Sequence, residues 1–488
     1  MSVTTSELLT ISSVGQRLFT LELPQMASFA CSEVVRVVPE KRVVCRGAWN
    51  SQSVYAKLFM GRDAQHYALR DKSGVESLKL TAIKTPDLLA ESEIKDGYVL
   101  IFSEIADAQN AEQVYQLANF EQRSQLAKAL VLAVAQHHNA NLIQTDLYLK
   151  NFLVQGEKIY TLDGDGIRKY AGLSQQQALK NLCVLLSKFD VLEIENWLPG
   201  LLKTYAEARG WQMAPDAELI KKMTNAHRQK AASNYADKKV FRQCTDVAVY
   251  RDSQVFTAVS SDFLDLDLPQ TSQKLDSLVT SQNLLKNGNT CTVAKVEINH
   301  QSIVIKRYNI KSFWHGVSRA LRQTRAATSW ANAHRLKLLD IPTANPIALI
   351  EERKFGLRGR AYFLCEYINA PDAAQFFASR AGKVSRAETI KNIITLFYKF
   401  YLLKISHGDT KATNIKIVNH QPVLIDLDSM TQHAFASSAL KGHVRDLRRF
   451  MRNWQDDQAL YNAFIKTFKV IYADHTPLKM AGILQNTK

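Results

Sequence analysis

Four polar residues recur in this chain at one spacing: an Asp, an Asn five residues later, and an Asp-x-Asp pair twelve residues further on. In a chain of this length such a pattern should arise by chance on the order of 0.003 times, because each residue type makes up roughly one residue in twenty. The second occurrence therefore indicates an internal repeat and predicts two homologous domains. The two copies are Asp146, Asn151, Asp163 and Asp165, and then Asp409, Asn414, Asp426 and Asp428.

Carboxylate and amide groups in this order suit phosphoryl transfer from ATP. That reaction needs Mg²⁺ on the phosphates, a cation beside them, and an acceptor next to the substrate hydroxyl. In kinases an Asp in a loop after a helix takes the hydroxyl proton, while an Asn in that loop and an Asp after the following hairpin hold Mg²⁺. The alternative is that these residues merely form turns and helix caps. The pattern predicts Asp409 and Asp146 as catalytic, and Asn414, Asp426, Asn151 and Asp163 as metal ligands.

Two lysines upstream of these loops are candidates for binding the ATP phosphates. Lys57 and Lys306 each end a run typical of a β-strand. Glu76 follows Lys57 by nineteen residues on the next predicted helix, where it can pair with the lysine and fix its direction. An ordinary surface glutamate is the competing interpretation of Glu76.

The second half has no counterpart of Glu76. Between Lys306 and Ile350 the only acidic residue is Asp340, and Ser329 lies about where a partner is expected. Another group must therefore orient Lys306. Two further residues could contact the nucleotide: Gly288, in a turn that is equally typical of an ordinary hairpin, and Lys411, two residues after Asp409.

The same order of elements is predicted in both halves: strands, a helix, more strands, a helix, the polar loop, a short hairpin, then helices. We place the domain boundary near residue 240, which gives domains 1–240 and 241–488. The first half contains a hairpin over 43–57, helices over 64–80 and 121–138, a strand over 98–103 and helices within 174–230. The second contains strands over 293–298, 302–306 and 362–367, and helices over 315–339 and 386–404.

The composition indicates a folded protein of two or three domains. The chain has 488 residues, 46% hydrophobic and 22% charged. No apolar run is long enough to span a membrane, and the first residues do not resemble a signal peptide. The six cysteines form no C-x-x-C pair, so we expect reduced thiols in the cytoplasm and no metal site made by cysteine.

Basic residues are concentrated in the second half. Residues 1–240 carry 28 Lys and Arg against 26 Asp and Glu; taken from the totals of 62 and 46, this leaves 34 against 20 for the remainder. Such a charge favours polyanions, namely nucleic acid, anionic lipid or phosphorylated glycan, although a solvated basic surface is the simpler interpretation. The segment 306–325 combines Lys and Arg with aromatic residues and no acid, which suits an anionic membrane surface or a glycolipid, unless it packs on its own domain.

These residues resemble the InaA-type lipopolysaccharide kinases, relatives of the core heptose kinase and the Kdo kinase. The resemblance lies in motifs and covers roughly residues 35–235 and 280–460. One departure is Gln144-Thr145, where the second half has His407-Gly408. The matching stretches are Ile305-Lys-Arg-Tyr-Asn309, Ala333-His-Arg-Leu336, Ile341-Pro-Thr-Ala-Asn-Pro346, His407-Gly-Asp409 and Leu424-Ile-Asp-Leu-Asp428, with Val44-Cys-Arg-Gly47, Tyr55-Ala-Lys-Leu-Phe59 and Thr85-Pro-Asp-Leu-Leu89 in the first half.

The resemblance implies an α+β fold of two tandem bilobal protein-kinase-like domains, each with a small β-rich N-lobe and a mostly helical C-lobe. It implies phosphorylation of a heptose or Kdo hydroxyl of the lipopolysaccharide inner core, with ATP and Mg²⁺ as cofactors. The partner would be the core oligosaccharide or another anionic glycolipid, at the cytoplasmic face of the inner membrane. We favour the second half as the catalytic unit, because it has the complete His-Gly-Asp loop.

Four rival functions remain open. A protein serine/threonine kinase is disfavoured, because fewer than twenty residues separate Asp426 from the predicted helix at Arg445 and leave little room for a peptide-docking loop. A soluble small-molecule kinase fits the same motifs. A tandem pseudokinase would bind glycolipid or a partner without turnover. A nucleic-acid binder would explain the charge but not the ordered metal-ligand pattern, so no nucleic acid is expected.

Overall fold

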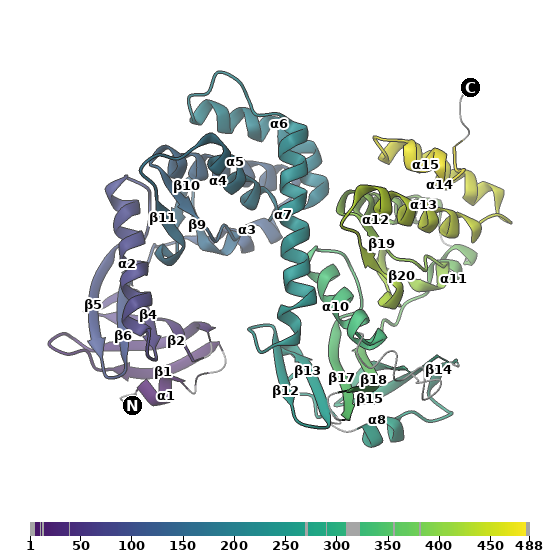
Figure 1. Ribbon diagram of the computed structural model, residues 1–488, viewed down its shortest axis with the longest axis horizontal. Helices are drawn as coiled ribbons and strands as arrows, with labels where there is room; N and C mark the ends of the chain where they lie inside the picture. The colour runs from purple at the N-terminus through teal and green to yellow at the C-terminus, as the bar shows by residue number, and fades with distance from the viewer. Residues whose placement is uncertain are drawn as a thin grey trace. The chain divides into compact units, whose positions relative to one another are not determined.

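The computed structural model describes residues 5–9, 11, 14–38, 40–268, 272–288, 290–308, 323–354, 357–379 and 382–484. Contacts divide the chain into two compact units, residues 1–228 and residues 229–488, which we call unit 1 and unit 2 and describe separately (Figure 1). The division falls within helix α7 (Ala217–Asp237), a little before the boundary expected near residue 240.

Unit 1 begins with a six-stranded antiparallel sheet in the order β1-β2-β3-β4-β6-β5. Side chains alternate between its faces: Ala56 and Leu58 pack on one side, whereas Phe59 packs on the other against helix α2. The helix can lie there because small or apolar residues repeat along one stripe. The elements are α1 (Thr5–Leu9), β1 (Gly15–Leu21), β2 (Phe29–Val38), β3 (Arg42–Trp49), β4 (Gln52–Met60), α2 (Ala64–Leu80), β5 (Leu88–Ile94) and β6 (Gly97–Ser103).

The rest of unit 1 is mostly helical around a second apolar core. Helix α4 starts at a capping box of Asn119 and Gln122 and buries Leu130 and Val134 against α5 and α6. Short strands carry the polar loop between α4 and α5. The elements are β7 (Gln109–Asn110), α3 (Ala111–Leu117), α4 (Phe120–Asn139), β8 (Leu142–Gln144), η1 (Leu149–Asn151), β9 (Phe152–Gln155), β10 (Lys158–Thr161), η2 (Gly164–Gly166), β11 (Ile167–Lys169), α5 (Gln175–Leu186) and α6 (Val191–Ala208).

Unit 2 has a seven-stranded antiparallel sheet in the order β12-β13-β17-β18-β16-β15-β14, with helix α10 packed against β16, β17 and β18. Its other face holds an apolar cluster that includes Ile303, Ile305 and Leu364. The elements are η3 (Lys239–Phe241), β12 (Val247–Arg251), β13 (Val255–Ser260), η4 (Ser261–Phe263), α8 (Ser272–Leu278), β14 (Leu284–Asn287), β15 (Cys291–Ile298), β16 (Gln301–Tyr308), α10 (Arg325–Leu338), β17 (Pro346–Lys354) and β18 (Leu357–Glu366).

The second part of unit 2 is helical, and aromatic rings dominate its interior. Phe450 of α13 contacts Phe397 of α12 and Phe464 of α14. The elements are α11 (Ala373–Ala378), α12 (Lys383–Leu403), β19 (Ile405–Ser406), η5 (Ala412–Asn414), β20 (Ile415–Val418), β21 (Gln421–Leu424), η6 (Leu427–Ser429), β22 (Thr431–Gln432), α13 (Ala436–Arg452), α14 (Gln458–Ile471) and α15 (Thr476–Met480).

The predicted α+β class is confirmed, and most predicted elements coincide with observed ones. The helix expected over 64–80 is α2, and the hairpin expected over 43–57 is β3 with β4. The helix expected over 315–339 is described only as α10, from Arg325. Most of the basic aromatic segment 306–325 lies outside the described residues, so its membrane role stays a prediction.

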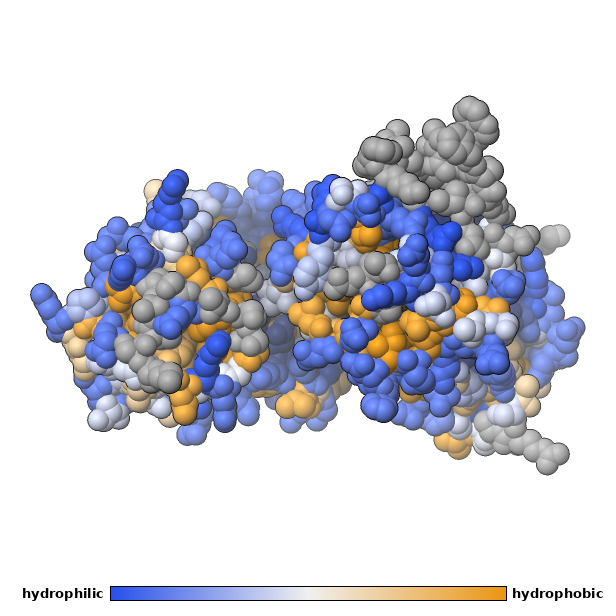
Figure 2. All heavy atoms as spheres, turned by 90° about the horizontal axis from the view of Figure 1, so that it is seen from below, coloured by the Kyte–Doolittle hydropathy of each residue, from blue (hydrophilic) through white to orange (hydrophobic). Residues whose placement is uncertain are grey.

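The surface view in Figure 2 is largely hydrophilic, with hydrophobic side chains gathered in smaller areas between the polar ones. Within the described parts of the chain, no helix combines the length and the apolar character needed to cross a bilayer. The exposed large apolar residues are scattered over many elements, among them Leu80, Leu117 and Val384.

Candidate active site

The aspartate loop of unit 2 is held in place by an aspartate of helix α13. Asp446 accepts hydrogen bonds from the backbone N–H of His407 at 2.6 Å and of Gly408 at 2.9 Å, and its carbonyl accepts one from the Thr410 hydroxyl at 2.7 Å. Gly408 has φ +80°, and a Cβ there would lie 2.6 Å from the Ser429 carbonyl oxygen. Glycine is therefore the residue that fits the position directly before Asp409.

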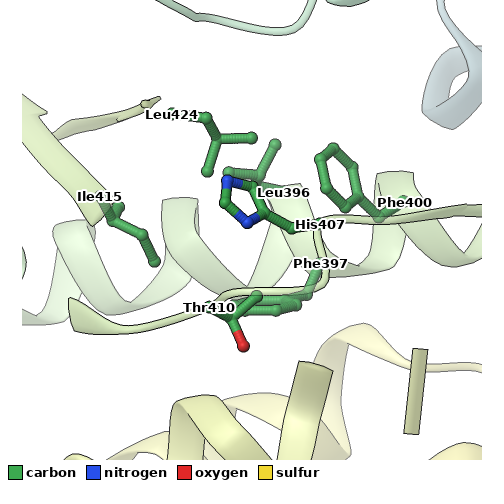
Figure 3. Close-up of a pocket in the computed structure, with 7 residues that line it drawn as sticks. All are labelled: Leu396, Phe397, Phe400, His407, Thr410, Ile415 and Leu424. Carbon is green, nitrogen blue, oxygen red and sulfur yellow. The ribbon is translucent and has the colours of Figure 1, made fainter. Parts of the chain in front are cut away.

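The imidazole of His407 links the loop to the strand end that carries Asp426. Its Nε2 lies 3.1 Å from the Ile425 carbonyl and its Nδ1 lies 3.3 Å from the backbone N of Asp409. Burial lowers the pKa of His407, although the carbonyl contact opposes this effect. These partners assign the neutral ring with a proton on Nε2. Figure 3 shows the ring in a small apolar pocket with Leu396, Phe400, Ile415 and Leu424, so this pocket packs the loop and is not a substrate site.

Asp409 itself is reachable from solvent and is surrounded by cations. Its side chain is 23% exposed, its Oδ1 lies 2.5 Å from Arg449 Nη2, and its Oδ2 lies 4.0 Å from Lys411 Nζ. Asn414 donates from Nδ2 to the Asp409 carbonyl at 2.9 Å. This bond commits the amide nitrogen to the loop and leaves the amide oxygen as the group that could bind a metal.

The hairpin of β20 and β21 delivers Asp426 in a left-handed conformation, with φ 62° and ψ 61°. Lys306 Nζ, on β16, donates to Asp426 Oδ1 at 3.2 Å. Burial disfavours the charged lysine, but the Asp426 carboxylate outweighs this effect, and the pKa of Lys306 lies above its ordinary value. Burial likewise acts against the carboxylate, yet Lys306 holds the pKa of Asp426 below its ordinary value. Asp426 is therefore the partner of Lys306.

The polar side chains of helix α10 bind the segment that follows Asp426, and they do not pair with Lys306. Arg325 Nη2 lies 2.5 Å from Asp428 Oδ2, and Asn332 donates to the carbonyls of Leu427 and Met430, both at 2.9 Å. Ser329, which the sequence places near a partner position, is buried and bonded to the Tyr308 hydroxyl at 2.9 Å. No acidic side chain of α10 contacts Lys306, as expected.

Gly288 lies in the turn between β14 and β15, where its N–H donates to the Cys291 carbonyl at 3.1 Å. Among the described residues, a Cβ at Gly288 would meet only the Cys291 carbonyl oxygen and the Lys286 side chain within 4 Å. Its role in covering phosphates therefore stays a prediction.

Unit 1 builds its loop with the same backbone geometry and different braces. Asn151 donates from Nδ2 to the Asp146 carbonyl at 2.8 Å, and Asp163 has φ 66° and ψ 75°. Gln144 takes the place of the histidine, because its amide donates to the carbonyls of Leu162 and Asp163, both at 3.1 Å. Asn181 on α5 donates in turn to the Gln144 carbonyl at 2.9 Å.

The predicted pair of Lys57 with Glu76 is wrong. Lys57 Nζ lies 2.5 Å from Asp71 Oδ2, whereas Glu76 is 54% exposed in its side chain and lies 3.9 Å from Lys72. The two acids are five residues apart on α2, so they point about 140° away from each other. Asp71 shares the buried stripe of Ala68 and Val75, and an acid on that stripe is the signal that the sequence reading missed.

Two arginines that the sequence reading also missed face Asp163 in unit 1. Arg42 Nη1 lies 3.6 Å from Asp163 Oδ1 and Arg36 Nη1 lies 3.9 Å from Oδ2, while Lys57 Nζ lies 3.5 Å from Oδ1. Burial acts against the carboxylate, but Lys57, Arg42 and Arg36 hold the pKa of Asp163 below its ordinary value. No motif in the sequence indicates that β2 supplies Arg36 and β3 supplies Arg42 to this site.

The donors of unit 2 fit Mg²⁺. Among the described residues, no group of three or more His, Cys, Asp and Glu side chains could enclose a metal. A kinase-type Mg²⁺ site does not need one, because a carboxylate and an amide oxygen suffice when phosphate oxygens and water complete the octahedron. Asp426 and the amide oxygen of Asn414 would be that pair. In unit 1 the amide is arranged similarly, but both oxygens of Asp163 already face cations.

Residues 273–468 match the lipopolysaccharide kinase (Kdo/WaaP) family. The C-terminal half thus carries a lipopolysaccharide kinase family domain. The match spans every unit 2 residue of the candidate site, from Gly288 to Arg449. No curated protein matches the chain. A structure of vaccinia related kinase 3 is 13% identical and covers 46% of this chain and 94% of its own, with a TM-score of 0.28.

Proposed function

We propose that unit 2 is an ATP- and Mg²⁺-dependent kinase that phosphorylates a heptose or Kdo hydroxyl of the lipopolysaccharide inner core. The observation that carries this proposal is the joint placement of Lys306, Asp409, Asn414 and Asp426 within the region that matches the lipopolysaccharide kinase family. The doubled loop geometry supports two tandem kinase-like domains, of which unit 2 is the active one.

Each unit 2 side chain has a defined part in this reaction. Lys306 would bind the ATP phosphates, while Asp426 and the amide oxygen of Asn414 would hold Mg²⁺, whose charge would neutralise the β- and γ-phosphates. Asp409 accepts the proton of the sugar hydroxyl while the oxygen of that hydroxyl attacks the γ-phosphorus. The bond to the bridging oxygen of ADP breaks, and the sugar leaves as a phosphate ester. Lys411 neutralises charge on the transferred group.

The surface next to Asp409 suits an anionic acceptor. Helix α13 presents a row of cations that begins at Arg449, beside Asp409, and continues over exposed positions. Phosphate and carboxylate groups of an inner core would be attracted to this row, and so would an anionic membrane surface. This favours a glycolipid at the cytoplasmic face of the inner membrane over a neutral small sugar. The row consists of Lys441, Arg445, Arg448, Arg449 and Arg452.

Replacing Asp409 or Asp426 with Ala tests the proposal. Each substitution should abolish addition of phosphate to the core oligosaccharide, because one removes the proton acceptor and the other removes the metal ligand. The core from a deletion strain complemented with each variant is analysed by mass spectrometry. Phosphorylation at the wild-type level in both variants would refute the assignment. A loss of phosphorylation in Asp146→Ala alone would move catalysis to unit 1.

A tandem pseudokinase is the alternative that one observation favours, because α10 offers Lys306 no acidic partner. Such a protein would bind ATP with Mg²⁺ and hold a glycolipid without turnover. Asp409→Asn separates the two functions. It should leave nucleotide binding intact in both cases, but it should stop phosphorylation only if unit 2 is an enzyme.

A further inference from the structure

Arg42 of unit 1 occupies the position that Cys291 occupies in unit 2. Lys57 pairs across the strands with Val44, and Lys306 pairs with Val293. Two residues further along the lysine strand, Phe59 pairs with Arg42 and Tyr308 pairs with Cys291. The register is identical, so unit 1 has a guanidinium where unit 2 has a small neutral side chain on the strand next to the phosphate lysine.

The guanidinium of Arg42 points at the two carboxylates of this site. Besides its 3.6 Å contact with Asp163, it lies 4.0 Å from Asp71 Oδ2, and its side chain is only 13% exposed. Arg36 and Lys57 complete the group. Three cations thus surround two carboxylates, which leaves an excess of positive charge. In unit 2, among the described residues, Asp426 forms its ion pair with Lys306, and Lys286 acts on it only at longer range.

This charge arrangement does not fit Mg²⁺. A metal ion needs an Asp163 oxygen at about 2.1 Å. Lys57 and Arg42 already lie at 3.5 Å and 3.6 Å from Oδ1, and Arg36 lies at 3.9 Å from Oδ2. A divalent cation at either oxygen would be repelled by these neighbours in a partly buried site. A phosphate group fits instead, because guanidinium groups bind its oxygens in pairs and an ammonium group adds a third cation.

The surroundings of the lysine also differ in bulk. Tyr55, two residues before Lys57, pairs with Phe102, whose ring centre lies 5.2 Å from Lys57 Nζ. The same positions in unit 2 are Val304 and Cys365. The Phe102 ring therefore lies beside the lysine at a position where unit 2 has the small Cys365 side chain, and less room remains for a flat purine there.

We propose that unit 1 binds a phosphate group directly on Arg36, Arg42 and Lys57, without a divalent metal and without a nucleotide base. Unit 1 then recognises a phosphorylated ligand and does not transfer phosphate. The proposal concerns unit 1 alone and stands whether or not unit 2 phosphorylates lipopolysaccharide. The ligand class is a phosphate ester or a diphosphate.

Calorimetric titration of the full chain with inorganic pyrophosphate in EDTA tests the proposal, with Lys306→Ala as the background that weakens phosphate binding to unit 2. Binding should persist in EDTA and should not strengthen when Mg²⁺ replaces EDTA. Arg42→Cys, which installs the unit 2 residue, should weaken binding at least tenfold, and Arg36→Ala should weaken it severalfold. Lys79→Ala is the matched control, because it removes a unit 1 cation that pairs with Asp87 away from the site.

Asp163→Asn separates the two kinds of site by the sign of its effect. In a cation site it should strengthen metal-free binding severalfold, because the carboxylate that competes for Arg36, Arg42 and Lys57 is lost. In a metal site it should abolish a binding that depends on Mg²⁺, and that result would overturn the proposal. Unchanged affinity in Arg42→Cys would also overturn it, as would ATP binding tenfold more tightly than pyrophosphate in EDTA. Thermal unfolding identifies any variant that fails to fold.

Discussion

The carboxylate of Asp446 accepts a hydrogen bond from the backbone N–H of His407, with 2.6 Å between Oδ2 and the nitrogen. The carboxylate belongs to α13 and the loop follows α12, so the bond ties the loop to a helix residue thirty-nine positions after His407. Hydrogen bonds to a charged acceptor contribute about 1.5–3 kcal/mol each. The position of Asp409, the proposed proton acceptor, thus depends on a residue that need not contact any substrate.

The titration of Asp446 predicts a pH dependence of stability. Burial raises the pKa of Asp446 to about 6, against the two backbone hydrogen bonds that lower it. Since this value lies above that of the unfolded chain, the contribution of Asp446 to the free energy of unfolding is largest below about pH 4. It should fall by about 3 kcal/mol as pH rises to about 6. Denaturant unfolding of the wild type and of Asp446→Asn from pH 4 to 7 checks this, because the difference between the two curves should show this fall.

Replacing His407 with Gln should be tolerated better than replacing it with Ala. Gln144 reaches the equivalent carbonyls in unit 1 at 3.1 Å, so a glutamine can form the brace that His407 forms with Ile425. We expect His407→Gln to keep phosphorylation within about tenfold of wild type and His407→Ala to lose about a hundredfold, as about 2.7 kcal/mol of lost positioning implies. Phosphate incorporation into purified core lipid measures both. Equal losses would show that the carbonyl contact is unimportant.

Arg449 should affect acceptor binding more than turnover. Its guanidinium lies 2.5 Å from Asp409 and heads the cationic row of α13. Arg449→Ala should raise the KM for the anionic glycolipid about tenfold, leave the KM for ATP unchanged, and weaken the salt dependence of the reaction. Arg448→Ala is the comparison within the same row and should have the smaller effect, since this side chain contacts the Met480 carbonyl and not Asp409. An identical effect of both variants would argue for general surface charge.

Gly408→Ala should destabilise unit 2 and inactivate it. The residue has φ +80°, and its new Cβ would collide with the Ser429 carbonyl. We expect a cost of about 2–3 kcal/mol, from backbone strain and the displaced loop. Gly382→Ala is the matched substitution in the same unit, because nothing lies within 4 Å of its Cβ and its φ is −60°. Differential scanning calorimetry compares the two, and equal melting temperatures would contradict the strain.

In unit 1, Asp71 and Glu76 should differ sharply in their effect on stability. Asp71 is buried beside Lys57, so Asp71→Asn leaves a lysine partly unpaired and should cost about 3 kcal/mol. Glu76→Gln alters an exposed side chain and should change the free energy of unfolding by less than about 0.5 kcal/mol. Denaturant unfolding of the full chain measures both values. The reverse order would restore Glu76 as the partner of Lys57.

The sequence was sufficient for local elements and for the loops, because both are encoded by short-range patterns. The apolar periodicity predicted α2 over Ala64–Leu80, and the doubled spacing located Asp163 and Asp426 after their hairpins. It did not predict partners that depend on which face of a helix is buried. The prediction chose Glu76 because it lies nineteen residues after Lys57. The apolar stripe of α2, which contains Asp71, indicates the buried partner instead.

Contacts between distant segments were beyond the sequence patterns. Asp446 stands alone as an acid in the basic helix α13, and only the packing of that helix under the loop reveals its role. In the sequence, Arg36 and Arg42 occupy the polar positions of strands in which polar and apolar residues alternate, which is typical of residues that face solvent. Their meeting with Asp163 requires the sheet to be placed against η2, which no local periodicity specifies.

The exchange of Arg42 for Cys291 at one register position has a genetic side. The arginine codons CGU and CGC differ from the cysteine codons UGU and UGC in their first base only. One transition in either half of such a gene would remove or introduce the guanidinium beside the lysine. Where the arginine codon is CGU or CGC, a single base substitution therefore exchanges the guanidinium for the small thiol that unit 2 carries at this position.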